Sequence, residues 1–182
     1  MEISMSNIST RLACDGALRR LADGENDALE IIYDKLGRRI FLLALSILND
    51  PHAAEDIMQD TFVRLLQSRA VGYTPGSNSI AYILTVTRNL ALNALPRRAR
   101  EVPSEISDDA TPHFYSPEDQ PLNTLSVFNI LNREERQIVL LKLEYGMKHR
   151  DIADLLGISR AACEKKYSRA TAKMRDYYKK GD

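Results

Sequence analysis

The sequence predicts an all-α protein in which two small helical domains are joined by an acidic, proline-containing linker. Apolar residues recur at helical spacing in roughly the first hundred residues and again after residue 122. Between them, residues 101–121 hold four of the seven prolines and six acidic residues, a composition that opposes a packed helix. A connection of this length is unusual inside one compact domain. We therefore expect one domain over residues 15–100 and another over residues 122–180.

Three periodic helices, and a shorter helix before Gly24, are expected in the first domain. The first periodic helix runs from about Asp27 to Leu48, and its apolar residues are Ile32, Leu36, Ile40 and Leu43. The segment Asn49-Asp50-Pro51 ends this helix and begins the next, because aspartate can cap a helix and proline suits its first position. The apolar stripe of the second helix consists of Ala54, Ile57, Met58, Phe62, Leu65 and Leu66.

A loop rich in glycine, proline and serine follows at residues 72–79 and leads into the third helix. The buried candidates of this third helix are Ile83, Leu84, Leu90 and Ala94, and Pro96 lies near its end. Together these elements make the first domain a bundle of three or four helices.

The second domain is predicted to contain a helix-turn-helix. The run from Asn132 to Glu135 resembles a capping box and opens a helix that stops near Gly146. A short helix containing Ile152, Ala153 and Leu156 follows, then a turn at Gly157 and a final helix capped by Ser159.

The final helix is strongly basic, although the whole chain has 25 basic and 25 acidic residues. A neutral protein can still carry a local basic patch, and lysine and arginine at that place can neutralise DNA phosphates. The first turns of such a helix reach base edges in the major groove. The side chains expected to point outward are Arg160, Glu164, Lys165, Ser168 and Arg169. The alternative is a merely solvated helix face; the preceding helix and glycine turn favour DNA binding.

An acidic and polar face is predicted on the second helix, formed by Glu55, Asp56, Gln59 and Asp60. Such a face can bind a basic helix of a protein partner, although taken alone it is more often just a polar surface. The absence of a glycine loop or metal-ligand spacing argues against catalysis.

The segment from Tyr73 to Arg100 combines aromatic, amide and basic side chains. They are Tyr73, Tyr82, Asn78, Asn89, Asn93, Arg88, Arg97, Arg98 and Arg100. This combination suits unstacked single-stranded bases, and a pocket could hold a flipped base. Equally, the tyrosines could belong to the core and the arginines could stabilise the end of the helix.

Other function classes are excluded by composition. The two cysteines, Cys14 and Cys163, are outside any Cys-x-x-Cys or Cys/His cluster, which argues against a zinc site or a disulfide framework and fits a reducing cytoplasm. No apolar run approaches the length of about 20 residues that crosses a bilayer, and no signal peptide is evident. We expect a cytoplasmic protein without membrane insertion.

Several of these motifs resemble the extracytoplasmic-function group of bacterial sigma-70 factors. Residues 54–62 (AEDIMQDTF), 81–84 (AYIL) and 88–91 (RNLA) are similar to region 2 of that group. Residues 131–137 (LNREERQ) and 151–159 (DIADLLGIS) are similar to region 4. The likeness covers nearly everything from about residue 27 to 178, and the two motif sets split by a linker are highly specific.

The resemblance implies an alternative sigma factor that binds core RNA polymerase and directs promoter recognition and strand opening, with no catalysed reaction, metal or cofactor. The segment that binds the clamp helices of the largest polymerase subunit would include Asp56, Gln59, Asp60 and Phe62. Minus-ten DNA would be contacted by Tyr73, Asn78, Tyr82, Arg88 and Asn89, with a base captured in the loop from about residue 68 to 78. Minus-thirty-five DNA would be contacted by Arg160, Glu164, Lys165, Ser168 and Arg169, with Lys166 on phosphate.

Departures from the family pattern affect the promoter sequence more than the assignment. Tyr82 stands where tryptophan is usual, Asn93 where aspartate is frequent, Ala162-Cys163 where threonine-valine is usual, and Glu164 where a basic residue is common. An anti-sigma protein is a further candidate partner, and the linker acids could mimic nucleic acid in the polymerase channel. Two alternatives remain at this point: an ordinary helix-turn-helix regulator and a helical adaptor.

Overall fold

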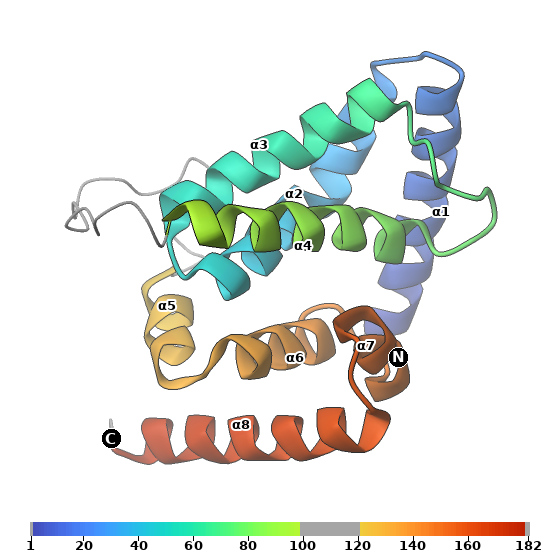
Figure 1. Ribbon diagram of the computed structural model, residues 1–182. Helices are drawn as coiled ribbons and strands as arrows, with labels where there is room; N and C mark the ends of the chain where they lie inside the picture. The colour runs from blue at the N-terminus through green and yellow to red at the C-terminus, as the bar shows by residue number, and fades with distance from the viewer. Residues whose placement is uncertain (1, 99–120, 181–182) are drawn as a thin grey trace.

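The computed structural model describes residues 2–98 and 121–180, and all regular secondary structure in those ranges is α-helical. Four helices precede the predicted linker and four follow it (Figure 1). The helices are α1 (Glu2–Ala22), α2 (Ala28–Leu48), α3 (Pro51–Ser68), α4 (Ser79–Arg98), α5 (Pro121–Ile130), α6 (Arg133–Leu143), α7 (His149–Leu156) and α8 (Arg160–Lys180). The all-α prediction is thus confirmed for the described residues, whereas the predicted linker of residues 101–121 lies almost entirely outside them.

Helix α2 is the centre of the molecule, and α1, α3, α4 and α6 all pack against it. Its second half is buried on every side: each residue from 40 to 47 is at most 4% exposed. A helix that is apolar all round belongs in an interior, because each of its faces needs another element to cover it. The predicted single stripe was therefore only part of the buried surface of α2.

The junction between α2 and α3 follows local rules and was predicted correctly. Asn49 adopts a left-handed conformation that ends α2. The carboxylate of Asp50 accepts a hydrogen bond of 3.0 Å from the amide of Ala53, and Pro51 occupies the first turn of α3.

The helix before Gly24 is longer than predicted. Helix α1 has 21 residues, as many as α2, and the predicted domain start at Asp15 falls inside it. Cys14, Leu18 and Leu21 are buried against the core, whereas Ile8 and Leu12 are exposed.

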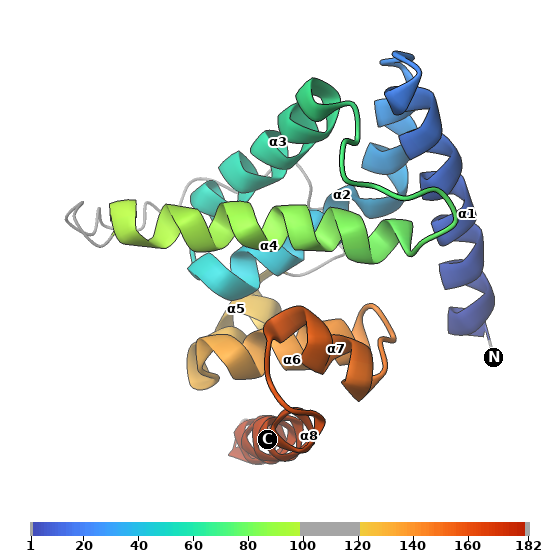
Figure 2. The ribbon, with the colours of Figure 1, turned by 45° about the vertical axis from the view of Figure 1, so that its right-hand side comes forward.

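The four helices after the linker form a second layer beneath α2 and α4 (Figures 1 and 2). The capping box is confirmed: Asn132 and Glu135 exchange two hydrogen bonds of 3.0 Å at the start of α6. The helix-turn-helix of α7 and α8 is also confirmed, with Gly157 in a left-handed turn (φ +69°). Helix α5 was not predicted, although Val127, Ile130 and Leu131 recur at helical spacing.

The two layers meet mainly where α6 packs on α2. The Arg38 guanidinium lies 2.8 Å from the Glu144 carboxylate, and the Tyr145 hydroxyl donates a hydrogen bond to the Arg39 carbonyl. The Arg39 guanidinium also lies 5.5 Å from the centre of the Tyr145 ring. Buried residues from both layers belong to one hydrophobic cluster, so the two halves are packed together in this structure.

Candidate nucleic-acid interface

The exposed face of α8 carries the side chains predicted to read duplex DNA. Ser159 caps the helix by accepting a 3.2 Å hydrogen bond from the amide of Ala162. Cys163 and Ala170 are buried on the side that faces α6 and α7, and α8 lies along the outer edge of the layer (Figure 2). The predicted side chains that are exposed on its other side are Arg160, Lys165, Ser168 and Arg169, and Glu164 is half-buried.

Arg160 and Glu164 form an ion pair at the start of this face. The Arg160 Nε lies 2.8 Å from the Glu164 Oε1, one helical turn further along. The Nδ1 of His149, on α7, lies 3.9 Å from the same carboxylate oxygen. Because acid and base at this spacing hold each other in place, Glu164 orients the arginine nearest the start of the helix.

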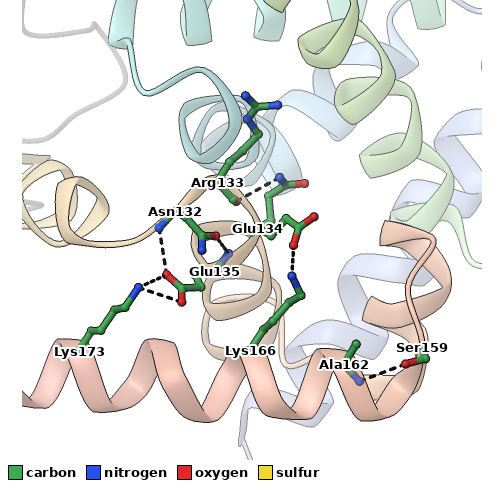
Figure 3. A network of polar contacts seen from close by, with 9 residues as sticks. Asn132, Arg133, Glu134, Glu135, Ser159, Ala162, Lys166 and Lys173 are labelled. Carbon is green, nitrogen blue, oxygen red and sulfur yellow. Dashed lines mark hydrogen bonds and ion pairs between the residues drawn. The ribbon is translucent and has the colours of Figure 1, made fainter.

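Two lysines of α8 are paired with acids at the start of α6 (Figure 3). Lys166 forms an ion pair with Glu134, and the Lys173 Nζ donates to both oxygens of Glu135, at 3.0 and 2.7 Å. Burial alone would raise the pKa of Glu135, but hydrogen bonds from Lys173 and from the Asn132 amide outweigh it and lower the pKa. Lys166, predicted to contact phosphate, thus also joins α8 to α6.

The acidic face of α3 is exposed as predicted at Asp56, Gln59 and Asp60. Phe62 differs from them, because it is only 7% exposed. Its ring packs 5.3 Å from the ring of Tyr33 on α2. Together with Leu29, Glu30 and Gln59, these two rings line a hollow of about 350 Å³ beside the acidic face.

Tyr33 is 42% exposed in this hollow, and sequence reasoning missed it. It lies one turn after Leu29, on the edge of α2 beside the predicted apolar stripe. An exposed aromatic residue next to the stripe was the available signal.

The loop between α3 and α4 brings Tyr73 and Tyr82 together. Their ring centroids are 5.4 Å apart with an angle of 52° between the planes, and the Tyr82 hydroxyl donates to the Val71 carbonyl at 3.0 Å. Both rings are half-buried against the core. Asn78 is exposed and caps α4, since its side-chain oxygen accepts a 3.2 Å hydrogen bond from the Ala81 amide.

Arg88 and Asn89 lie on different faces of α4. Asn89 is exposed, whereas the Arg88 Nε donates to the Gln137 side chain of α6 at 3.4 Å. Burial at this contact lowers the pKa of Arg88. The predicted minus-ten residues therefore do not form one open surface here, because α6 covers Arg88. The side chains of Arg97 and Arg98 lie outside the described part of the structure, and so does the whole of Arg100.

No group of three or more His, Cys, Asp or Glu side chains in the described part of the chain could hold a metal ion. Cys14 and Cys163 are free, buried thiols, and burial raises the pKa of Cys14 to about 11. Among the described helices, none has the length and apolar character needed to cross a membrane.

Comparison with known families decides between the remaining interpretations. The sigma-70 region 2 model matches residues 32–101, and the sigma-70 region 4 model matches residues 124–174. The chain belongs to the sigma-70 family. It is an alternative sigma factor, which binds core RNA polymerase and directs promoter recognition in transcription initiation. A regulator or adaptor lacking one of these two regions is excluded.

Individual sigma factors are similar over most of this chain. RNA polymerase sigma factor CarQ of Myxococcus xanthus is 30% identical over 165 residues, which cover 87% of this sigma factor and 94% of CarQ. The ECF sigma factor SigE of Mycolicibacterium smegmatis is 27% identical, over 81% of this chain and 62% of SigE. The structure resembles that of sigma factor RpoE in complex with the anti-sigma factor NepR from Bartonella quintana. That likeness has a TM-score of 0.66 at 22% identity, and covers 81% of this chain and 94% of RpoE.

Proposed function

We propose that this sigma factor uses a separate surface for each of three tasks, which are reading the minus-thirty-five element, holding minus-ten DNA and binding core polymerase. The exposed face of α8 reads the minus-thirty-five element as duplex. The loop between α3 and α4, with the outer face of α4, holds minus-ten DNA as an opened strand. The acidic face of α3 and the adjoining hollow bind core polymerase. The observation that supports this proposal is that the exposed basic side chains of α8 and the paired rings of Tyr73 and Tyr82 lie on opposite halves of the chain.

On minus-thirty-five DNA, Arg160 and Glu164, which form an ion pair in this structure, contact the base edges. An arginine can donate two hydrogen bonds to guanine, and a glutamate can accept one from cytosine. Lys165 and Arg169 are exposed further along the same helix and neutralise phosphates. Lys166 also binds a phosphate, and in doing so it leaves its ion pair with Glu134.

For core polymerase, Gln59 combines two properties at the rim of the hollow. Its side chain lines the hollow with Tyr33 and Phe62, and it is exposed beside Asp56 and Asp60. An apolar hollow rimmed by acids suits a helix that presents an apolar anchor among basic residues. The clamp helices of the largest polymerase subunit are the partner we assign to it.

The packed arrangement of the two halves has to open on a promoter. The centres of the two elements are about 25 base pairs apart, which is about 85 Å along the duplex at 3.4 Å per base pair. A compact chain of this length is about 40 Å across. The two surfaces can reach both elements only if α6 leaves α2, and this movement also releases Arg88 from Gln137 for minus-ten DNA.

The remaining parts of the proposal concern a protein inhibitor, the cellular location and the linker acids. Because RpoE was solved with an anti-sigma factor, a protein that stabilises the packed arrangement is a candidate inhibitor of this chain. The chain itself catalyses no reaction and works in the cytoplasm, where polymerase meets DNA. The acids of residues 101–121 act as a nucleic-acid mimic in the polymerase channel; unchanged abortive and full-length RNA yields after their replacement by serine would reject this.

The decisive experiment adds the purified chain to core polymerase and genomic fragments and measures run-off transcripts. Discrete promoter-specific transcripts are expected, together with a stable complex of chain and core. If neither is obtained, the proposed function fails.

The assignment of the core-binding surface has its own test. Gln59→Ala together with Asp60→Ala should weaken core binding by about tenfold, the scale of an interface hot spot, and should spare binding of minus-thirty-five duplex. Gln67→Ala, an exposed substitution at the other end of α3, is the matched control. Equal core affinity for all three proteins would show that another surface binds polymerase.

A further inference from the structure

Asp15, on α1, contacts the loop between α3 and α4 at two separate points. The Tyr73 hydroxyl donates to the Asp15 Oδ1, and the Gly76 amide donates to the same oxygen at 3.1 Å. The other carboxylate oxygen lies 2.8 Å from the Arg19 guanidinium. The Asp15 side chain is only 16% exposed, so it is largely withdrawn from solvent beneath the loop.

The loop consists of two turns, and the Tyr73 side chain of the first turn also contacts the Ser77 side chain of the second. The Tyr73 amide bonds to the Ala70 carbonyl in the first turn, and the Ser77 amide bonds to the Thr74 carbonyl in the second. Gly76 has a left-handed φ of +85°, which suits glycine and turns its amide toward Asp15. Asp15 therefore links the first turn, through Tyr73, to the second turn, through Gly76.

The same helix also fixes the end of the loop. The buried Ser79 hydroxyl donates to the Arg11 carbonyl at 2.8 Å, where α4 begins. The Tyr73 ring, whose hydroxyl is held by Asp15, packs against Tyr82. The orientation of the paired rings thus depends on α1, which ends before the residues matched by the region 2 family model.

We propose that Asp15 is a positioning residue that holds the two turns and the Tyr73 ring in the conformation that receives an unpaired minus-ten base. This inference rests on the proposed role of the loop in strand capture. A loop already held in its binding conformation loses less conformational entropy when the base arrives. Without Asp15, that entropy must be lost on binding, and affinity for the unpaired base falls.

The ionisation of both partners supports this role at neutral pH. Hydrogen bonds from Tyr73 and from the Gly76 amide lower the pKa of Asp15. Burial, together with the neighbouring Asp15, raises the pKa of Tyr73 to about 12. At the near-neutral pH of a transcription assay, the Asp15 carboxylate therefore stays ionised and accepts hydrogen bonds, and the Tyr73 hydroxyl stays protonated and donates one.

The experiment uses the holoenzyme and a fork template made from a promoter found in the run-off assay. The template is duplex through the minus-thirty-five element, and its non-template strand is unpaired across the minus-ten element. A second set of templates carries one abasic site at each unpaired position in turn. The abasic site that weakens binding of the unsubstituted holoenzyme identifies the captured base.

Asp15→Ala should lower affinity for the intact fork about tenfold, the scale of a lost charge-assisted hydrogen bond, and should abolish most of the abasic penalty. Asp15→Asn keeps an oxygen that can accept both hydrogen bonds and should retain most of the penalty. Tyr73→Phe keeps the ring and removes the hydroxyl together with its contacts to Asp15 and Ser77, so it tests the role of the hydroxyl if Asp15→Ala does not fold. Asp23→Ala replaces an exposed acid directly after α1. It is the matched control and should behave like the unsubstituted protein.

Two results would overturn the inference about Asp15 alone. One is a full abasic penalty in both Asp15→Ala and Tyr73→Phe. The other is an equal loss of affinity on intact and abasic forks, because that pattern means general destabilisation. Absence of an abasic penalty in the unsubstituted holoenzyme, with run-off transcripts still present, would instead overturn the capture site itself and with it the role of Asp15.

Discussion

The helix-turn-helix and the loop between α3 and α4 are both assigned to DNA, but they are built by contacts of different range. The turn before α8 depends on Gly157 and on the Ser159 cap, which bonds three residues along the chain. The loop before α4 depends on Asp15, which is 58 residues from Tyr73 and 61 from Gly76. A short-range site can be recognised from a sequence pattern, whereas a long-range one becomes visible only when the helices are in place.

The largest expected effect concerns the core under the helix-turn-helix. Ile152 is fully buried, and Ile152→Ala should lower the free energy of unfolding by about 2–5 kcal/mol through lost apolar contact and a new cavity. Minus-thirty-five duplex binding should fall with it. Thermal unfolding followed by circular dichroism measures the loss; Ala161→Ser on the exposed side of α8 is a mild control. Unchanged stability would mean that this half does not depend on its own core.

A glycine exchange tests the short-range turn directly. Gly157 has a φ of +69°, so Gly157→Ala should cost about 1–2 kcal/mol from left-handed strain. Gly16 lies inside α1, and an added Cβ would meet no other part of the protein within 4 Å besides its chain neighbours and the helix's own backbone, so Gly16→Ala should stabilise the chain by about 0.5–1 kcal/mol. Chemical denaturation measures both changes. The same sign for the two substitutions would contradict the assignment of their backbone conformations.

Removing the cap of α6 should have a moderate effect. Asn132→Ala breaks one hydrogen bond of the capping box and should cost about 1 kcal/mol. Asn89→Ala, an exposed position inside α4, should cost nothing, because alanine has the higher helix propensity. Equal midpoints of urea unfolding for these two variants would show that the cap contributes no stability.

The smallest expected effect is a pH dependence at Glu135. Its folded pKa is lowered, so its contribution to stability is present above the ordinary carboxyl range and is lost as the pH falls through the folded pKa. Lys173→Met removes the strongest stabilising hydrogen bonds to the carboxylate and should flatten this acid-side loss. Melting temperatures measured from pH 7 down to pH 3 would reveal it; parallel curves for both proteins would exclude the Lys173 contribution.

The limits of sequence reasoning follow the same division by range. Caps, turns and strong periodicity located α2, α3, α4, α6, α7 and α8, because these signals act within a few residues. The burial of the second half of α2 on every side was not predictable, since it depends on helices of both layers that pack against it. The same reason hid the contact of Arg88 with Gln137, 49 residues away, and the contact of the Phe62 ring with Tyr33. Family resemblance supplied roles for side chains, but it did not supply these contacts.

The central claim is that two halves packed together in the structure separate to work on two promoter elements. Dyes attached through Gln67→Cys and Lys179→Cys report their distance, since both positions are exposed and the buried native thiols react poorly. We predict measurable energy transfer in the isolated chain and lower transfer once core polymerase and promoter DNA are both bound. Equal transfer in the two states, with run-off transcripts confirmed in the same sample, would contradict the account.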